Sequence, residues 1–207
     1  MFDSSFIRLV PFSRSSAQVL CRNGKAVRLT TDHKPNLKNE KKRITDNYGV
    51  VHNIAGVWRA SLEPSRQPAG APVFHMSVSR GFGDVSLKEP YEIIVPTPEV
   101  DIVPLTPEDW FFVIGCDGIW DVLSDQQVVD TVGEHIDHPE SAAQAVADLA
   151  FNKMSMDNLT VIVVFFDWTR DAATAFFEQR KASSTRKLSA QATINDDDDD
   201  YDMFASH

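Results

Sequence analysis

The stretch that decides the fold is WFFVIGCDG, residues 110–118. The run from Trp110 to Cys116 is aromatic, β-branched or small, which predicts a buried β-strand. Asp117 follows this run directly, so its carboxylate is expected at the edge of a hydrophobic core. Gly118 comes next and allows the backbone to turn sharply or to approach a ligand closely.

A second acid stands before a second buried run. Asp157 and Asn158 precede LTVIVVFF, residues 159–166. If the two strands pair antiparallel, Asp117 and Asp157 lie at the same sheet edge. If they run parallel, the acids are roughly 20 Å apart for a strand of about six residues. Because Mg²⁺ is typically held by one or two carboxylates and several waters, we interpret the pair as half of a divalent cation site. Periodicity alone leaves the strand direction open.

The composition is that of one soluble globular domain. The chain has 207 residues, of which 43% are hydrophobic and 24% charged, which suffices for a real core. The apolar runs are too short to cross a membrane, and the start at Met1 lacks the pattern of a secretory signal. Two cysteines, Cys21 and Cys116, cannot form a disulfide framework, so we expect an intracellular protein, cytoplasmic or nuclear.

The charge is concentrated near the carboxyl end. The formal net charge is −10, and the run DDDDDYD, residues 196–202, supplies six of the negative charges. Such a run predicts a solvated, disordered tail. No basic stripe interrupts the rest, so binding to nucleic acid is not expected.

The order of predicted elements indicates an α+β fold. Asn23-Gly24 between short apolar stretches predicts a hairpin, residues 36–46 a short exposed helix, and residues 49–59 two extended pieces followed by a loop. Residues 73–78 are compact and apolar and predict a strand in which His75 is expected in the core, and residues 91–103 predict an edge strand or two short strands.

Two consecutive helices are expected between the two acids. Ser124 to Gln127 is a capping-box pattern, and it opens a helix that buries Val128, Val129, Val132 and Ile136. Pro139 starts the second helix. A last helix is expected over residues 171–181, with disorder beyond Ser183. We therefore divide the chain into an atypical start (1–14), a main domain (15–168), and a carboxyl-terminal helix with an acidic tail (169–207).

Four motifs in order give the sequence a resemblance to a known family. They are LTTDHKP with Glu40 and Arg43-Ile44 (from residue 29), VSRGFGD (78–84), FFVIGCDGIWDVL (111–123) and DNLTVIVV (157–164). This set is similar to that of the metal-dependent serine/threonine protein phosphatases of the 2C type, also called PP2C or PPM-type. The resemblance covers about residues 16–167 and corresponds to the carboxyl-terminal part of the family's catalytic domain.

The resemblance implies a fold and a chemistry. The fold is a sandwich of two antiparallel β-sheets flanked by helix pairs, incomplete here at its amino-terminal side. The implied site holds two Mg²⁺ or Mn²⁺ ions, which activate a water that attacks phosphoserine or phosphothreonine in a phosphoprotein substrate. Asp117 and Asp157 resemble ligands of one of these metals. The resemblance assigns no catalytic side chain and no organic cofactor to this sequence.

The departures from the family pattern are as specific as the matches. The family's acidic "ED" and "DGHGG" motifs, which supply further metal ligands and a histidine, have no counterpart here. Ser15 stands where the family's "GDSRAVL" strand has an aspartate. The chain is therefore expected to be weakly active or inactive, as a truncated phosphatase. The alternative is a non-catalytic pseudophosphatase or interaction protein with a protein partner.

Several residues near these motifs have structural interpretations. Asp121 is expected to cap or orient its turn, Asp84 to serve a turn, and Arg80 to pair with a carboxylate. Asp32 and His33 are expected to lock their loop by hydrogen bonds. A phosphatase of the haloacid dehalogenase type, with Asp117 as nucleophile, is disfavoured because position 119 is Ile119 and strands and helices do not alternate.

Overall fold

The computed structural model describes residues 6–9 and 17–196. Its centre is a four-stranded antiparallel sheet with the strand order β3-β2-β7-β8. The strands are β2 (Ala17–Arg22), β3 (Lys25–Arg28), β7 (Asp109–Gly115) and β8 (Val161–Phe165). The strand that the sequence places in the core, β7, lies between two partners and is buried along nearly its whole length. The α+β prediction is confirmed.

The hairpin between β2 and β3 forms at the predicted turn. Asn23 and Gly24 have φ values of 49° and 71°. Two consecutive positive φ values in a two-residue connection are the geometry of a type I′ turn, which matches the twist of the flanking strands. The amide of Ala26 beyond the turn donates to the Gln126 side chain at 3.0 Å, which ties the hairpin to the helices.

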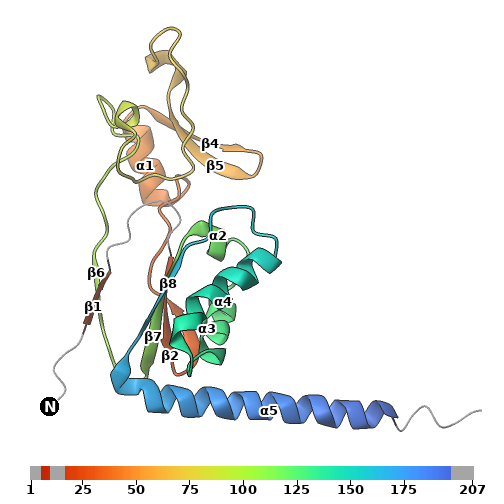
Figure 1. Ribbon diagram of the computed structural model, residues 1–207. Coiled ribbons are helices and arrows are strands. Elements are labelled where there is room, and N and C mark those ends of the chain that lie inside the picture. Colours follow the sequence, from red (N-terminus) through yellow and green to blue (C-terminus); the bar gives the residue numbers. More distant parts are fainter. Residues whose placement is uncertain (1–5, 10–16, 197–207) are drawn as a thin grey trace, which may run out of the picture.

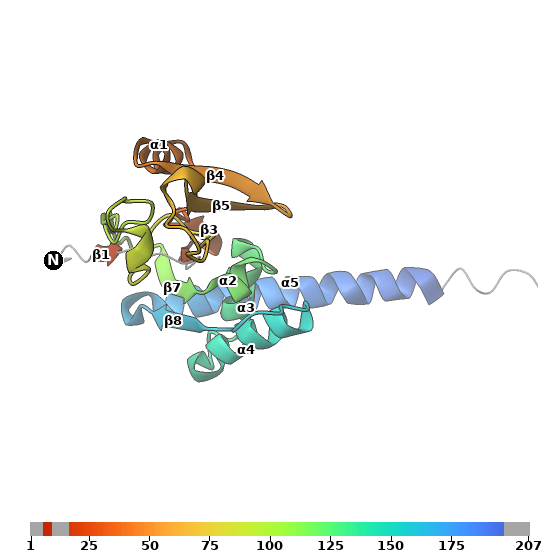
Figure 2. The ribbon, with the colours of Figure 1, turned by 90° about the horizontal axis from the view of Figure 1, so that it is seen from above.

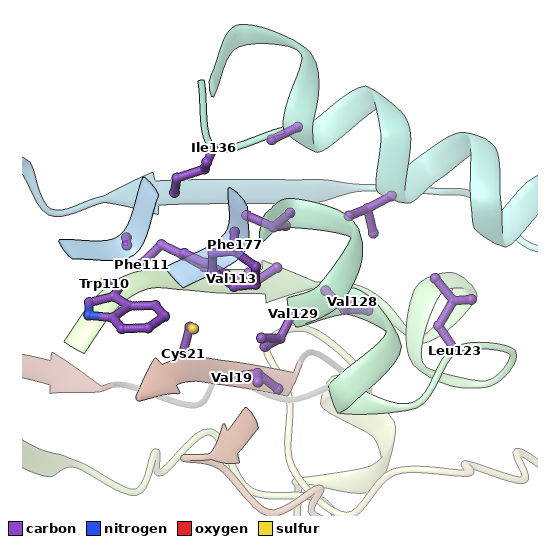
Figure 3. Close-up of a cluster of buried hydrophobic side chains, with 14 of the residues drawn as sticks. Val19, Cys21, Trp110, Phe111, Val113, Leu123, Val128, Val129, Ile136 and Phe177 are labelled. Carbon is purple, nitrogen blue, oxygen red and sulfur yellow. The ribbon is translucent and has the colours of Figure 1, made fainter. Parts of the chain in front are cut away.

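Helices cover one face of this sheet. They are α2 (Asp117–Trp120), α3 (Asp125–Glu134) and α4 (Pro139–Asn152). The predicted capping box is present, because Ser124 and Gln127 exchange side-chain and backbone hydrogen bonds at the start of α3. Figure 3 shows Val128 and Val129 of this helix in one buried cluster with Phe111 and Val113 of β7.

A second group of elements stands beyond one end of the sheet (Figure 1). It contains α1 (Lys38–Asp46) and the hairpin of β4 (Gly49–Ile54) and β5 (Val57–Leu62), with a small core of its own. The remaining short elements are β1 (Phe6–Leu9), which pairs with β6 (Asp101–Pro104), and the 3₁₀ turns η1 (Pro64–Arg66), η2 (Val85–Leu87) and η3 (Asp167–Thr169).

The last helix is longer than the sequence predicts. Helix α5 (Arg170–Asp196) packs its first turns on the core through Ala173 and Phe177 and then runs out beyond the body of the molecule (Figure 2). The predicted loss of order beyond Ser183 is therefore wrong as far as Asp196. Residues 197–202, the rest of the acidic run, lie outside the described residues. Among the described helices none is long and apolar enough to cross a membrane.

In the middle of the chain one expectation is wrong and another is confirmed only in part. Residues 73–78 do not form a core strand: only Met76 makes a β-bridge, to Ala60, and His75 is exposed. An apolar stretch becomes a strand only where a neighbour can pair with it, and one bridge is all this segment finds. Of residues 91–103, the first part is irregular and only β6 is extended. Of the predicted start, only residues 6–9 are described.

Candidate metal centre

The end of β7 and the start of β8 lie side by side. Gly115 is paired with Val161 in an antiparallel register, and beyond this pair the amide of Cys116 donates to the carbonyl of Thr160 at 3.1 Å. The antiparallel alternative is therefore the correct one, and the parallel alternative is wrong. Asp117, just after β7, and Asp157, just before β8, therefore lie at the same end of these strands. We call this end of the sheet the rim; it carries α2 and faces the β4–β5 hairpin in Figure 1.

Gly118 holds the two sides of this rim together. A Cβ at position 118 would collide with the carbonyl oxygen of Asn158, so only glycine allows this approach. The Ser155 hydroxyl donates to the carbonyl of Gly118 at 2.6 Å, and the Cys116 thiol to the carbonyl of Asn158 at 3.1 Å. The sequence predicted a sharp turn or a close approach for Gly118; the structure shows the close approach, made to the chain itself.

Each predicted ligand is oriented by the amide that follows it. The amide of Gly118 donates to Oδ1 of Asp117 at 3.1 Å, and the amide of Asn158 donates to Oδ1 of Asp157 at 2.7 Å. These bonds engage one oxygen of each carboxylate, which has two. Asp117 is half-buried and Asp157 is exposed, so both can be reached from solvent.

Further acids share the electrostatic environment of the rim. Asp121 has a pKa raised above its ordinary value, first by burial and then by the negative charge of Asp117; Asp32 and Asp157 add to the rise, while Lys34 opposes it. Asp121 itself ends helix α2, where its amide donates to the carbonyl of Asp117 at 2.8 Å. The rim therefore concentrates negative charge that a divalent cation would neutralise.

The donor chemistry of the rim fits Mg²⁺ or Mn²⁺, but the number of donors does not complete a site. Both ions prefer oxygen ligands, and Asp117 and Asp157 supply carboxylates. Within residues 6–9 and 17–196, however, no group of three or more His, Cys, Asp or Glu side chains is arranged to hold a metal. The assignment of Asp117 and Asp157 as ligands stays a prediction.

Arg80, Arg43 and Glu40 form a second charged cluster. Arg80 Nη2 lies 2.6 Å from Glu40 Oε1, and Arg43 Nη2 lies 2.9 Å from Glu40 Oε2. Burial alone would raise the pKa of Glu40, but hydrogen bonds from Arg80, Ser79 and Arg43 outweigh it and lower the pKa to about 2. The expectation that Arg80 pairs with a carboxylate is confirmed.

Asp84 has the structural role expected of it, and His33 is hydrogen-bonded to a second loop through its main chain. The amide and hydroxyl of Ser79 both donate to the carbonyl of His33 at 2.9 Å, which joins two distant loops. Asp84 has φ 51° and begins the turn η2, where its carbonyl accepts from the amide of Leu87. Ser15 lies outside the described residues.

The sequence reasoning missed the cluster around Glu40. The only local signal was the spacing of Glu40 and Arg43, which places the two side chains on one face of a helix. The contribution of Asp32 and Lys34 to the field at the rim was likewise not foreseen, because these residues come from a loop far from α2 in the sequence.

Comparisons with known proteins identify related sequences. The family model described as protein phosphatase 2C matches residues 15–159. A probable protein phosphatase 2C 2 of Oryza sativa subsp. japonica is 34% identical over 188 residues, which cover 86% of this chain and 45% of that protein. Protein phosphatase 2C homolog 1 of Schizosaccharomyces pombe is 38% identical over 148 residues, which cover 70% of this chain and 37% of that protein.

The solved structures lead to the same family. The crystal structure of a serine-threonine phosphatase 2C from Toxoplasma gondii superimposes with a TM-score of 0.70 at 26% sequence identity, over 80% of this chain and 56% of that one. The chain thus spans less than half the length of these curated relatives and just over half of this solved structure. From its motifs, its fold and these matches, the chain belongs to the protein phosphatase 2C family.

Proposed function

We propose that this chain forms part of a metal-dependent phosphatase centre for phosphoserine and phosphothreonine in protein substrates. The observation that carries the proposal is the antiparallel pairing of β7 and β8, which brings Asp117 and Asp157 to one rim. Family membership supports the reaction class, and the accumulated negative charge around Asp121 supports a cation at this rim.

The roles of the chain's own residues follow from their contacts. Asp117 and Asp157 would bind Mg²⁺ or Mn²⁺, and the amides of Gly118 and Asn158 hold their carboxylates in fixed orientations. The contact between Gly118 and Asn158 keeps the two ligands at one rim. When bound, such an ion lowers the pKa of a coordinated water and so supplies a nucleophile at neutral pH.

The proposal includes a limit on activity. Hydrolases with two metals hold the ions about 3.5–4 Å apart, and two carboxylates cannot hold both. We therefore propose that the chain by itself has weak or no activity, and that full turnover needs further ligands. Its cysteine usage favours action in the cytoplasm or nucleus.

The experiment is Mn²⁺-dependent hydrolysis of a phosphothreonine peptide by the purified chain, compared with Asp117→Asn. We expect little or no turnover from either protein, and weak Mn²⁺ binding that Asp117→Asn reduces. Robust turnover that Asp117→Asn abolishes would disprove the limit on activity but support the site. Robust turnover that survives both Asp117→Asn and Asp157→Asn would disprove the site.

A second candidate function is that of a non-catalytic interaction protein, and one observation favours it. Strand β8 is an edge strand of the four-stranded sheet within the described residues, and its Ile162 and Val164 are 53% and 43% exposed. An apolar edge strand of this kind tends to acquire a partner. Size-exclusion chromatography and co-purification distinguish the two functions, since a free monomer with Mn²⁺-dependent turnover would contradict the second.

A further inference from the structure

Two histidines outside the rim lie in contact at the β4–β5 hairpin: one is on β4, and the other is in the segment whose Met76 makes a bridge to β5. Nε2 of His52, on β4, lies 3.1 Å from Nδ1 of His75, and the rings meet edge to face with their centroids 5.0 Å apart. His52 is half-buried and His75 is exposed. We propose that this pair binds a transition-metal ion of the Zn²⁺, Ni²⁺ or Cu²⁺ class, with water in the remaining coordination positions.

The spacing of the two nitrogens is close to what such an ion requires. Two imidazole nitrogens about 2.0–2.1 Å from a tetrahedral Zn²⁺ are about 3.3 Å apart, close to the 3.1 Å between His52 and His75; the rings must also turn so that both nitrogens point at the ion. In this contact one of the facing nitrogens carries a proton and donates the hydrogen bond, and the other accepts it. Because a nitrogen that binds an ion cannot also carry a proton, binding requires that ring to hold its proton on the other nitrogen.

The backbone holds the two rings in this position. His52 is paired with Arg59 in the β4–β5 ladder. The amides of Ala60 and Met76 donate to each other's carbonyls at 2.8 and 2.9 Å, which fixes the residue next to His75 against β5. Arg59 Nη1 also reaches the carbonyl of His75 at 3.3 Å. The guanidinium opposes a bound cation, but this is a solvent-exposed position where salt screens the repulsion.

The ligand type separates this pair from the rim. Imidazole nitrogen suits Zn²⁺, Ni²⁺ and Cu²⁺, whereas carboxylate suits Mg²⁺ and Mn²⁺. Because the described residues offer no third His, Cys, Asp or Glu to such a group, the ion would keep exchangeable water. The two sites should therefore fill with different metals.

The test is titration of the purified chain with Zn²⁺ and with Cu²⁺ in the presence of excess Mg²⁺, followed by calorimetry and, for Cu²⁺, by electron paramagnetic resonance. For the wild type we expect calorimetry to show one ion bound at this pair, and the Cu²⁺ spectrum to show coupling to two nitrogen ligands. Loss of one of two linked ligands weakens binding by about a hundredfold, so His52→Gln and His75→Gln should each remove this binding. The matched control is His138→Gln, which changes an exposed histidine next to Glu140 and should bind as the wild type does.

The outcomes decide the proposal without reference to phosphatase activity. Unchanged affinity in both His52→Gln and His75→Gln, or a copper spectrum with one coupled nitrogen, would overturn it. Circular dichroism and urea unfolding without metal show whether a variant is folded. Should one variant fail this check, the other and the wild-type spectrum still decide.

Discussion

The rim and the cluster around Glu40 use the same residue types in opposite ways. At the rim, partial burial is the first cause of the raised pKa of Asp121, and the negative charges of Asp117, Asp32 and Asp157 raise it further against the opposing charge of Lys34. In the cluster, Glu40 is buried between Arg43 and Arg80, and its pKa is lowered to about 2. A carboxylate that is paired with arginines stabilises the fold. Carboxylates that lie together with little opposing charge destabilise it, and a bound cation would offset their repulsion. Sequence motifs mark both regions; only the partners distinguish their roles.

The largest expected effect is at Glu40. Glu40→Gln leaves Arg43 and Arg80 without their shared buried carboxylate, and breaking a buried pair by removing one partner typically costs about 3 kcal/mol or more. Urea unfolding at neutral pH measures the loss. The matched control is Glu99→Gln, since Glu99 also contacts Arg80 but its side chain is 51% exposed; there we expect less than about 1 kcal/mol.

The pH dependence at Glu40 has a definite sign. Because the pKa in the folded protein is about 2, below the ordinary 4.5, the ionised form stabilises the fold above pH 4.5, and this stabilisation is lost as pH falls toward 2. Glu40→Gln should therefore lose less stability than the wild type across that window. Equal losses in both proteins would contradict the assigned pairing.

The second effect is at Gly118, and it connects stability to the rim. Gly118→Ala places a methyl group against the carbonyl of Asn158, so the two sides of the rim must separate. Forced overpacking costs about 1–3 kcal/mol, and we also expect weaker Mg²⁺ binding. Ser155→Ala is the control, because it removes a hydrogen bond to the same residue without a clash and should cost about 1 kcal/mol. A Gly118→Ala protein as stable as the wild type would show that the close approach does not constrain the rim.

Much of the fold could be predicted because its signals are local. The apolar run of β7, the Asn23-Gly24 turn and the Ser124–Gln127 capping box each act within a few residues, and each is present. The sequence left the direction of the second strand open, and the antiparallel pairing of β7 and β8 then placed Asp117 and Asp157 at the same rim.

The rest depended on contacts between distant residues or on helix propensity. Glu40 meets Arg80 across forty residues of chain, a partnership that no local pattern contains. His75 is exposed because its apolar neighbours find only one bridge. Helix α5 runs past its last buried contacts because Ala, Gln, Lys and Arg continue there and favour a helix without packing.

The third effect is stabilisation by the cation itself. Mg²⁺ that binds only the folded chain stabilises it by about 1.4 kcal/mol at ten times the dissociation constant. We expect Mg²⁺ to raise the unfolding temperature of the wild type but not of Asp117→Asn or Asp157→Asn. Asp148→Asn, an exposed acid on α4, should respond as the wild type does. An equal rise in all four proteins would place the bound Mg²⁺ elsewhere.

The smallest expected effect is at Asp121. Removing its charge should stabilise the chain, whereas removing the charge of Glu40 should destabilise it. Most of Asp121 is exposed although its carboxyl is partly buried, so solvent screens its repulsion with neighbouring acids and Asp121→Asn should stabilise the metal-free chain by less than about 1 kcal/mol. Since the pKa of Asp121 is raised in the folded protein, its ionisation costs stability as pH rises from the unfolded value of 3.8 through the folded one, and the cost persists at neutral pH. The gain should therefore be present at pH 7 and absent well below pH 3.8 in urea unfolding curves. Asp125→Asn, four residues on, removes an acid paired with Arg28 at 2.8 Å and should destabilise slightly at pH 7. Destabilisation by both variants would mean that the acids of the rim are already compensated, as Glu40 is.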